Sequence, residues 1–184
     1  LKENNINITN RILIDYYAHI VTPIHKLIDA TNEETTNNKI GTTCKGIGPT
    51  YTDKFQRIGI RAIDIIDKIS LKNKIEKRLS LALKNNEISQ NNLNNLNIEI
   101  SQFYEACNEI REFISDTFPI LHSSITSKIL IEGAQGTMLD IDHGTFPYVT
   151  SSNCSSGGIS PGLGISSRKI NKITGIFKAY TTRV

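Results

Sequence analysis

The segment over residues 41–61 carries groups that suit an anionic ligand. Its glycines allow a ligand to approach the backbone closely, and its hydroxyls and cations are the groups that bind phosphate together with backbone N–H. It is not a Walker A loop, because no Gly-Lys-Ser/Thr follows four residues after a glycine. Both a phosphate-binding loop and a solvated surface turn fit this composition. The residues concerned are Gly41, Thr42, Thr43, Lys45, Gly46, Gly48, Lys54, Arg57 and Arg61.

A second polar group surrounds Gln135, in the sequence Glu-Gly-Ala-Gln-Gly-Thr that begins at Glu132. The side-chain amide of Gln135 has both a donor and an acceptor, which suits the edge of a base or an oxo group. Thr150 opens a run of hydroxyl side chains that ends with the amide of Asn153, and these groups suit a phosphate or a ribose. A glutamine between small residues can also serve only its own loop, so both interpretations of Gln135 stay open.

Asp140, Asp142 and His143 are side chains of the kind that bind metal ions, and they suggest a metal-dependent phosphohydrolase as one alternative. Two carboxylates two residues apart share a face only on a strand, and carboxylates in turns are commonly solvated. We therefore predict no metal site. The remaining histidines have no second ligand or carboxylate at metal-binding spacing, and we interpret them as structural. They are His19, His25 and His122.

Buried strands and helices must position these loops. Residues 128–132 form a short apolar run that leads directly into Gly133, as a buried strand does before a ligand-binding turn. Apolar residues repeat at three- and four-residue steps over 99–118 and, less regularly, over 64–83, which predicts two helices. Cys107 lies on the first of these stripes, so we predict that it is a core residue.

Shorter patterns predict the other elements. Together with the strand over 128–132 they indicate an α/β fold with a central, mostly parallel sheet flanked by helices. We expect a strand over 11–15, a helix over 18–30 interrupted by Pro23, a polar turn over 31–39, a glycine-rich loop over 41–49, an asparagine-rich connector over 85–97, a short helical piece at 166–169 and a strand-like run over 174–184.

Composition excludes several classes of protein. The chain of 184 residues is 38% hydrophobic and 21% charged, without an apolar run of membrane-spanning length. Its 21 Lys+Arg and 18 Asp+Glu give a net charge of only +3, spread along the chain, which argues against a nucleic-acid partner. The three cysteines are widely spaced, so we expect no disulfide framework and a reducing cytoplasm. Because the chain starts at Leu1 and stops inside a strand-like run, we expect a piece of a longer protein.

Three stretches of the chain resemble the adenylosuccinate synthetase family. Residues 46–57, Gly-Ile-Gly-Pro-Thr-Tyr-Thr-Asp-Lys-Phe-Gln-Arg, match the family pattern G-I-G-P-x-Y-x-x-K-x-x-R. Residues 132–153 resemble the same family almost letter for letter, and so do residues 178–184, Lys-Ala-Tyr-Thr-Thr-Arg-Val. Three matches in the family's order are highly specific. The resemblance covers the whole chain, more weakly over 71–127.

The resemblance implies a P-loop-NTPase-like synthetase fold and a GTP-dependent ligase of AMP biosynthesis. In this family GTP phosphorylates the 6-oxygen of IMP, and the amine of L-aspartate then displaces that phosphate to give adenylosuccinate. The polar loops described above fit such a reaction, because the phosphoryl group and the 5′-phosphate both need positioned cations and N–H donors. GTP as co-substrate, Mg²⁺ and a homodimer are further implications.

Position within the matched stretches implies roles for individual residues. Thr43 and Thr150 match threonines that contact the IMP phosphate. Gln135 matches the glutamine near the 6-oxo group of IMP, and Lys54 matches the lysine of the family pattern, so both are candidate catalytic residues. Arg57 matches an arginine that reaches the IMP site of the partner subunit.

Val184 falls at a position that lines the ribose. The family's N-terminal G-D-E-G-K-G loop, with its aspartate base and magnesium contact, and its catalytic histidine are absent, as are its arginine-rich aspartate-binding loop and its T-K-L-D guanine site. We therefore expect residues 1–184 to be the central part of a single synthetase domain, incomplete at both ends, with the Mg²⁺ ligands elsewhere, and inactive alone. The alternative is a non-catalytic nucleotide-binding or dimerisation remnant.

Overall fold

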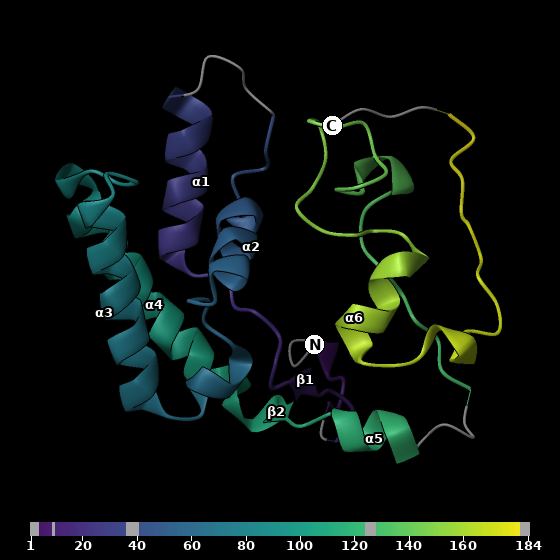
Figure 1. The fold of residues 1–184 in the computed structure, drawn as a ribbon. Coiled ribbons are helices and arrows are strands. Elements are labelled where there is room, and N and C mark those ends of the chain that lie inside the picture. Colours follow the sequence, from purple (N-terminus) through teal and green to yellow (C-terminus); the bar gives the residue numbers. More distant parts are fainter. Residues whose placement is uncertain (1–3, 9, 36–40, 124–127, 181–184) are drawn as a thin grey trace.

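The computed structural model describes residues 4–8, 10–35, 41–123 and 128–180. Strands β1, Ile14–Asp15, and β2, Ile114–Ser115, pair in parallel, with Ile14 opposite Ile114. Parallel strands need a long crossover between them, and helices supply it here (Figure 1). This is the predicted α/β arrangement, with a two-stranded sheet among the described residues where we expected a larger one.

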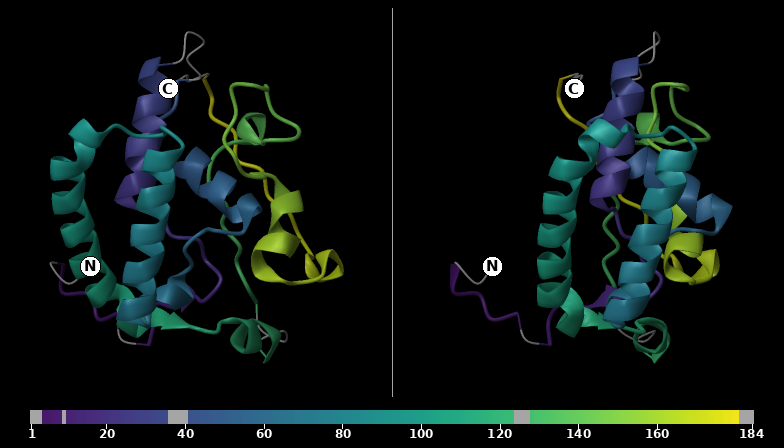
Figure 2. Two further views of the ribbon diagram at one scale, coloured as in Figure 1. Left: turned by 60° about the vertical axis from the view of Figure 1, so that its left-hand side comes forward. Right: turned by 90° about the vertical axis from the view of Figure 1, so that its left-hand side faces the viewer.

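Four long helices and two short ones make up most of the regular structure. Figure 2 shows that the four long helices lie together and that the chain after residue 128 lies to one side of them. Turns of 3-10 helix at Ala62–Ile65 and Arg111–Phe113 connect α2 to α3 and α4 to β2. The helices are α1 (Pro23–Thr35), α2 (Ile47–Gln56), α3 (Lys68–Lys84), α4 (Leu93–Ile110), α5 (Phe118–Ser123) and α6 (Ile159–Leu163).

One hydrophobic core holds the long helices together. Every buried apolar side chain of the described residues lies between Pro23 and Ile114, and none comes from residues 128–180. Cys107 belongs to this core with an exposed fraction of 2%, as its place on the apolar stripe predicted. The core consists of Ile24, Ile28, Ile60, Ala62, Ile65, Leu71, Ile75, Ala82, Ile88, Leu96, Ile100, Cys107 and Ile114.

The start of α1 corrects the prediction of a helix over 18–30 interrupted by Pro23. Proline begins this helix, because the first turn needs no N–H donor and proline already has a helical φ. The hydroxyl of Thr22 accepts the N–H of His25 at 3.4 Å, which caps the first turn. The helix then continues to Thr35, so the first residues of the expected turn over 31–39 are helical.

The predicted glycine-rich loop over 41–49 ends earlier than expected, because α2 begins at Ile47. Gly46 has a left-handed φ of 79°, and its carbonyl accepts the N–H of Thr50 at 3.1 Å. Pro49 is tolerated because it lies in the first turn of the helix, where no intrahelical N–H bond is lost. Nearly all of the matched stretch over 46–57 is therefore helix, because α2 covers Ile47–Gln56.

The helix predicted over 99–118 is shifted towards the N-terminus. It begins at Leu93, inside the expected asparagine-rich connector, and it ends at Ile110. Ile114 continues the helical spacing of apolar residues in the sequence, but it pairs with Ile14 in the sheet. Tertiary pairing therefore overrides the local periodicity at this end of the helix.

The strand predicted over 128–132 is also wrong, because these residues form no ladder in the described part of the chain. They are not buried, and the side chain of Leu130 is 93% exposed. Residues 174–180 of the strand-like run are irregular and exposed as well. An apolar run becomes a buried strand only when a neighbouring strand and a covering layer are present, and the described residues supply neither.

Candidate functional site

Two adjoining cavities lie between α2 and the part of the chain after residue 128. The first has a volume of about 470 Å³ and the second of about 410 Å³. Ile47, Tyr51 and Gly162 line both, so the cavities form one continuous groove, with α2 on one side and α6 on the other. The lining is mixed in character, with apolar, aromatic, cationic, carboxylate, amide and hydroxyl side chains. Its polar and charged members include Asp15, Tyr17, His19, Thr50, Tyr51, Lys54, Arg61, Glu132, Gln135, Ser152, Asn153 and Ser155.

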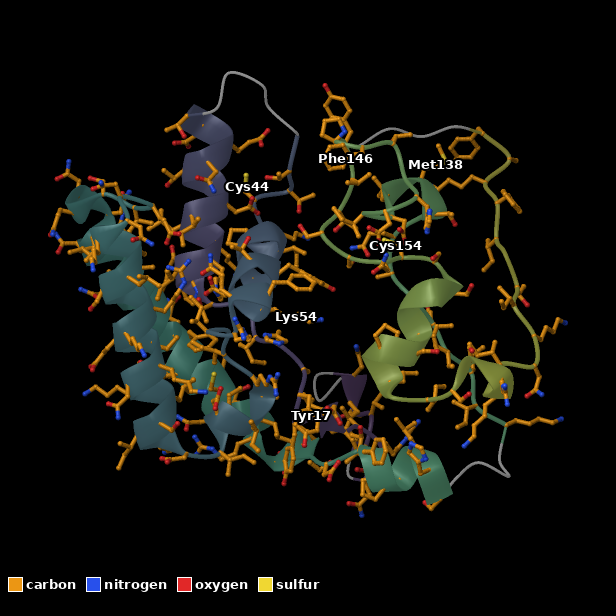
Figure 3. All side chains as sticks on the ribbon, in the orientation of Figure 1. Tyr17, Cys44, Lys54, Met138, Phe146 and Cys154 are labelled. Atoms are coloured by element: carbon orange, nitrogen blue, oxygen red, sulfur yellow. The ribbon has the colours of Figure 1, made fainter. Side chains whose placement is uncertain are left out.

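Lys54 lines the first cavity from α2. Its side chain is exposed, and in Figure 3 it extends from α2 on the side of the molecule where α6 lies. The Nζ atom lies 5.2 Å from the ring centroid of Tyr51 and 5.9 Å from that of Phe55, which are cation–π distances. The two rings therefore hold the ammonium group at the groove, where it can meet an anion.

Gln135 lines the second cavity from the loop after residue 131. Its backbone has a left-handed φ of 65°, and its side chain is exposed. The thiol of Cys154, which also lines this cavity, donates a weak hydrogen bond to Gln135 Oε1 at 3.9 Å. The amide nitrogen of Gln135 is thus left as a donor towards the groove, as expected for reading an acceptor on a ligand.

Asp140 organises the loop that follows Gln135. Its carboxylate is fully buried and accepts the N–H groups of Asp142, His143 and Ser155 and the amide of Asn153. Burial alone would raise the pKa of Asp140, but these donors outweigh it and hold the pKa far below its usual range. The carboxylate is therefore a structural acceptor, and its lone pairs are already used by the protein.

This arrangement does not support the metal-dependent phosphohydrolase alternative. Asp142 Oδ2 accepts the amide of Asn153 at 2.6 Å, so the second carboxylate also has a protein partner. Across the residues that the structure describes, no cluster of three His, Cys, Asp or Glu side chains could hold a metal ion.

Three other predicted site residues lie outside the lining of the two cavities. Thr43 is exposed in the loop before α2, and Arg57 is exposed just after α2, with a left-handed φ of 64°. Thr150 is half-buried, and its N–H donates to the carbonyl of Leu139 at 2.9 Å. Val184 lies outside the described residues. The structure therefore places Lys54 at the first cavity and Gln135 at the second, the two adjoining cavities that make up the groove.

The loop that carries Thr43 is tied to α1. Asp29 accepts the hydroxyl of Thr42 at 3.2 Å and the N–H of Gly46 at 2.8 Å through its two carboxylate oxygens. These bonds fix both flanks of Thr43 while its own side chain stays exposed. Because Asp29 belongs to α1, these bonds also fix the start of α2 relative to α1.

The three histidines interpreted as structural have different surroundings. His25 is fully buried, as a structural histidine is, and its Nε2 atom lies 2.9 Å from a carboxylate oxygen of Asp53, 28 residues along the chain. His19 lines the first cavity, where burial and then the charges of Arg61 and Lys54 lower its pKa. The ring of His122 lies 4.0 Å from the ring of Phe118.

Sequence reasoning identified Asn153, which lines the second cavity, but missed Tyr51 and the buried pair of His25 with Asp53. Tyr51 belongs to the matched family pattern, but the pattern does not show that its ring contacts the ammonium group of Lys54. His25 and Asp53 are 28 residues apart, and no local pattern connects two single polar residues over that distance.

Cys107 has the buried character that its place on the helical stripe predicted. All three cysteines are free, so there is no disulfide. Burial raises the pKa of the Cys107 thiol to about 11, which keeps it protonated and unreactive. Cys44 is exposed, and Cys154 is half-buried beside Gln135.

The parallel strand pair, connected by helices, defines an α/β protein, and the groove of mixed lining between α2 and α6 is its candidate ligand site. The family model of adenylosuccinate synthetase matches residues 1–184. The chain therefore belongs to the adenylosuccinate synthetase family.

Individual relatives agree with this assignment. The chain is 44% identical to adenylosuccinate synthetase of Thermodesulfovibrio yellowstonii and 46% identical to that of Endomicrobium trichonymphae, in each case over its whole length. A solved structure of fully ligated adenylosuccinate synthetase from Plasmodium falciparum superposes on 93% of the chain with a TM-score of 0.80 and 35% identity. The chain spans 44% and 43% of the two relatives' lengths and 41% of the solved chain. Among the described helices, none is long and apolar enough to cross a membrane.

Proposed function

We propose that the protein containing this chain catalyses the GTP-dependent joining of IMP and L-aspartate to form adenylosuccinate. In this reaction the γ-phosphoryl group of GTP moves to the 6-oxygen of IMP, and the aspartate amine then displaces phosphate from carbon 6. The observation that carries the proposal is the match of the whole chain to the adenylosuccinate synthetase family, including both stretches that line the groove. The remnant alternative has no specific observation in its favour.

Gln135 and Lys54 are the proposed catalytic residues of this chain. A donated hydrogen bond from the Gln135 amide to the 6-oxo group would orient that oxygen and stabilise the charge that develops on it. Cys154 supports this role, because its hydrogen bond occupies the carbonyl end of the amide. Lys54 would place a positive charge beside the transferred phosphoryl group, with Tyr51 and Phe55 holding its ammonium group.

Thr43, Thr150 and Val184 are proposed contacts to the 5′-phosphate and ribose of IMP. The exposed side chain of Thr43 between two tethered neighbours supports its assignment, since it is free to meet a ligand at a fixed place. Arg57 is proposed to reach the IMP site of a partner subunit in a homodimer. Its exposure at the end of α2 and its left-handed backbone, which directs it out of the helix, support this role.

GTP and Mg²⁺ are proposed as co-substrate and metal. The family's G-D-E-G-K-G loop and T-K-L-D site have no match in residues 1–184, and we therefore propose that the Mg²⁺ and guanine contacts lie elsewhere in the protein. Residues 1–184 would then form the central part of one synthetase domain and have no turnover alone. We place the enzyme in the cytoplasm, which the three free cysteines support.

The test is turnover by the full-length protein. Purified enzyme with IMP, aspartate, GTP and Mg²⁺ is expected to form adenylosuccinate, and omission of any substrate is expected to abolish it. Gln135→Ala is expected to lower kcat more than it raises the KM for IMP, because the contact strengthens as the 6-oxygen gains charge. Gln102→Ala, at an exposed position on α4, is the matched control. Absence of adenylosuccinate with the intact protein would refute the proposal, and an effect on KM alone would refute the role of Gln135.

A further inference from the structure

A buried network of charged and polar side chains joins three helices behind the groove. Asp53 of α2 accepts a hydrogen bond from His25 Nε2 of α1 at 2.9 Å and from Arg78 Nε of α3 at 2.6 Å. The exposed fractions of the three side chains are 2%, 0% and 5%. Arg78 also donates to Glu87 Oε2 at 2.7 Å, so the guanidinium group connects two carboxylates.

The hydrogen bonds define the protonation state of His25. The backbone N–H of Thr22 can only donate, and it donates to His25 Nδ1 at 3.0 Å, so Nδ1 carries no proton. Nε2 therefore carries the proton that is donated to Asp53. Arg78 is then the cation that balances the buried charge of Asp53. Burial opposes that charge, but the bonds from His25 and Arg78 outweigh it, so the pKa of Asp53 is below its usual value.

The burial of such a network does not by itself identify its role. Breaking a buried ion pair is costly, yet well-packed apolar residues in its place are often as stable, so burial of the pair is weak evidence for a role in stability. A directional set of hydrogen bonds differs from apolar packing because it specifies one relative orientation of the helices. In this protein the hydrogen bonds fix the orientation of α2 relative to α1 and α3, and α2 forms one wall of the groove.

The backbone of Asp53 also stabilises the C-terminal end of α2. Its carbonyl accepts the N–H of Ile58 at 3.0 Å and of Gly59 at 3.1 Å, while the carbonyl of Lys54 accepts the N–H of Arg57 at 3.1 Å. One residue therefore anchors α2 to α1 and α3 through its side chain and shapes the turn that presents Arg57 through its main chain. Lys54 follows it directly in the sequence and points away to the groove.

We propose that Asp53, held by His25 and Arg78, is a positioning residue that sets the place of Lys54 and Arg57 for nucleotide binding. This inference rests on the proposed function for its substrate, IMP, but its structural part concerns α2 alone. None of the three residues lines the groove, so they act through Lys54 and Arg57 and not by contact with the ligand.

The experiment uses the full-length protein with Asp53→Asn, which keeps the shape of the side chain and removes its charge. Arg78→Lys is the second variant, because it keeps the charge and loses the Nε donor. Lys74→Ala is the matched control, since it breaks an exposed ion pair of α3 with Asp64, 2.8 Å long, that does not touch α2. Hydrogen exchange of the amides at residues 57–59 reports the end of α2 without any substrate, and steady-state kinetics report the KM values.

We expect both network variants to raise the KM for IMP by about tenfold and to leave the KM for GTP within about twofold, at a temperature where circular dichroism shows them folded. Exchange at residues 57–59 is expected to accelerate by about tenfold, with α4 unchanged. An IMP KM and α2 exchange equal to those of Lys74→Ala would overturn the proposal, and so would an equal rise in all KM values. If the unmodified protein has no turnover, the proposed function fails, and the exchange data still decide whether the network positions α2.

Discussion

Gly46 directly precedes α2, at the point where this helix packs against α1. Replacing Gly46 by alanine tests whether the close contact between the two helices contributes to the stability of the protein. The backbone has a φ of +79°, which costs an L-residue about 1–2 kcal/mol. An added Cβ would lie 2.8 Å from the backbone nitrogen of Lys26 and 2.9 Å from the carbonyl carbon of His25. Because these atoms are backbone, α2 would have to move away from α1, which adds about 1–3 kcal/mol.

Gly41 is the matched control for this prediction. It has a similar φ of +76°, but no atom lies within 4 Å of an added Cβ. Both replacements also reduce the entropy of the unfolded chain, which offsets about 0.4–1 kcal/mol. We therefore expect Gly41→Ala to lower the free energy of unfolding by about 1 kcal/mol and Gly46→Ala by about 2–4 kcal/mol.

Urea unfolding of the full-length protein, followed by circular dichroism, measures both changes in stability. Each change follows from the shift in the midpoint urea concentration, with the slope of the unfolding free energy against urea held constant. The difference between the two variants isolates the steric contact, since the backbone conformation is shared. Equal losses of stability would refute the reasoning that the contact of Gly46 with α1 positions α2. The IMP affinity of Gly46→Ala is expected to fall as well, because α2 forms one wall of the groove.

Three further predictions concern acid stability, thiol reactivity and the dimer. Asp140 and Asp53 have pKa values below the ordinary 3.8 in the folded protein, so their contribution to stability is fully present above the unfolded value and is lost progressively as the pH falls from there towards their folded values. The urea midpoint should therefore decline below about pH 5 and continue to decline under the ordinary pKa, and it should decline less in Asp140→Asn. Iodoacetamide at about pH 8 should alkylate exposed Cys44 well before Cys107, whose thiol has a pKa of about 11, and equal rates by mass spectrometry would contradict this. Arg57→Leu should raise the KM for IMP by at least about tenfold, since it removes a charged hydrogen bond to a ligand. Mixing it with Gln135→Ala subunits should restore activity, because one composite site per hybrid dimer is then intact; a mixture that stays inactive would count against a shared site.

Local patterns were enough to predict several features of the chain. The helical spacing around Cys107 predicted a buried residue of a long helix, and the structure confirms it. The stretches over 46–57 and 132–153 were recognised from their letters, and the family comparison confirms the resemblance. These predictions succeeded because helical periodicity and a sequence pattern are properties of neighbouring residues, which a linear chain displays directly.

Contacts between distant residues decided the rest. Ile114 has helical spacing in the sequence but pairs in the sheet with Ile14, a hundred residues earlier. The apolar run around Leu130 is exposed and has no strand to pair with among the described residues. The bond between His25 and Asp53 crosses two helices, and neither residue differs in its sequence context from a solvated polar side chain. Pairing, burial and hydrogen-bond partners depend on which surfaces meet in space, and that is a property of the folded chain that no short stretch of sequence contains.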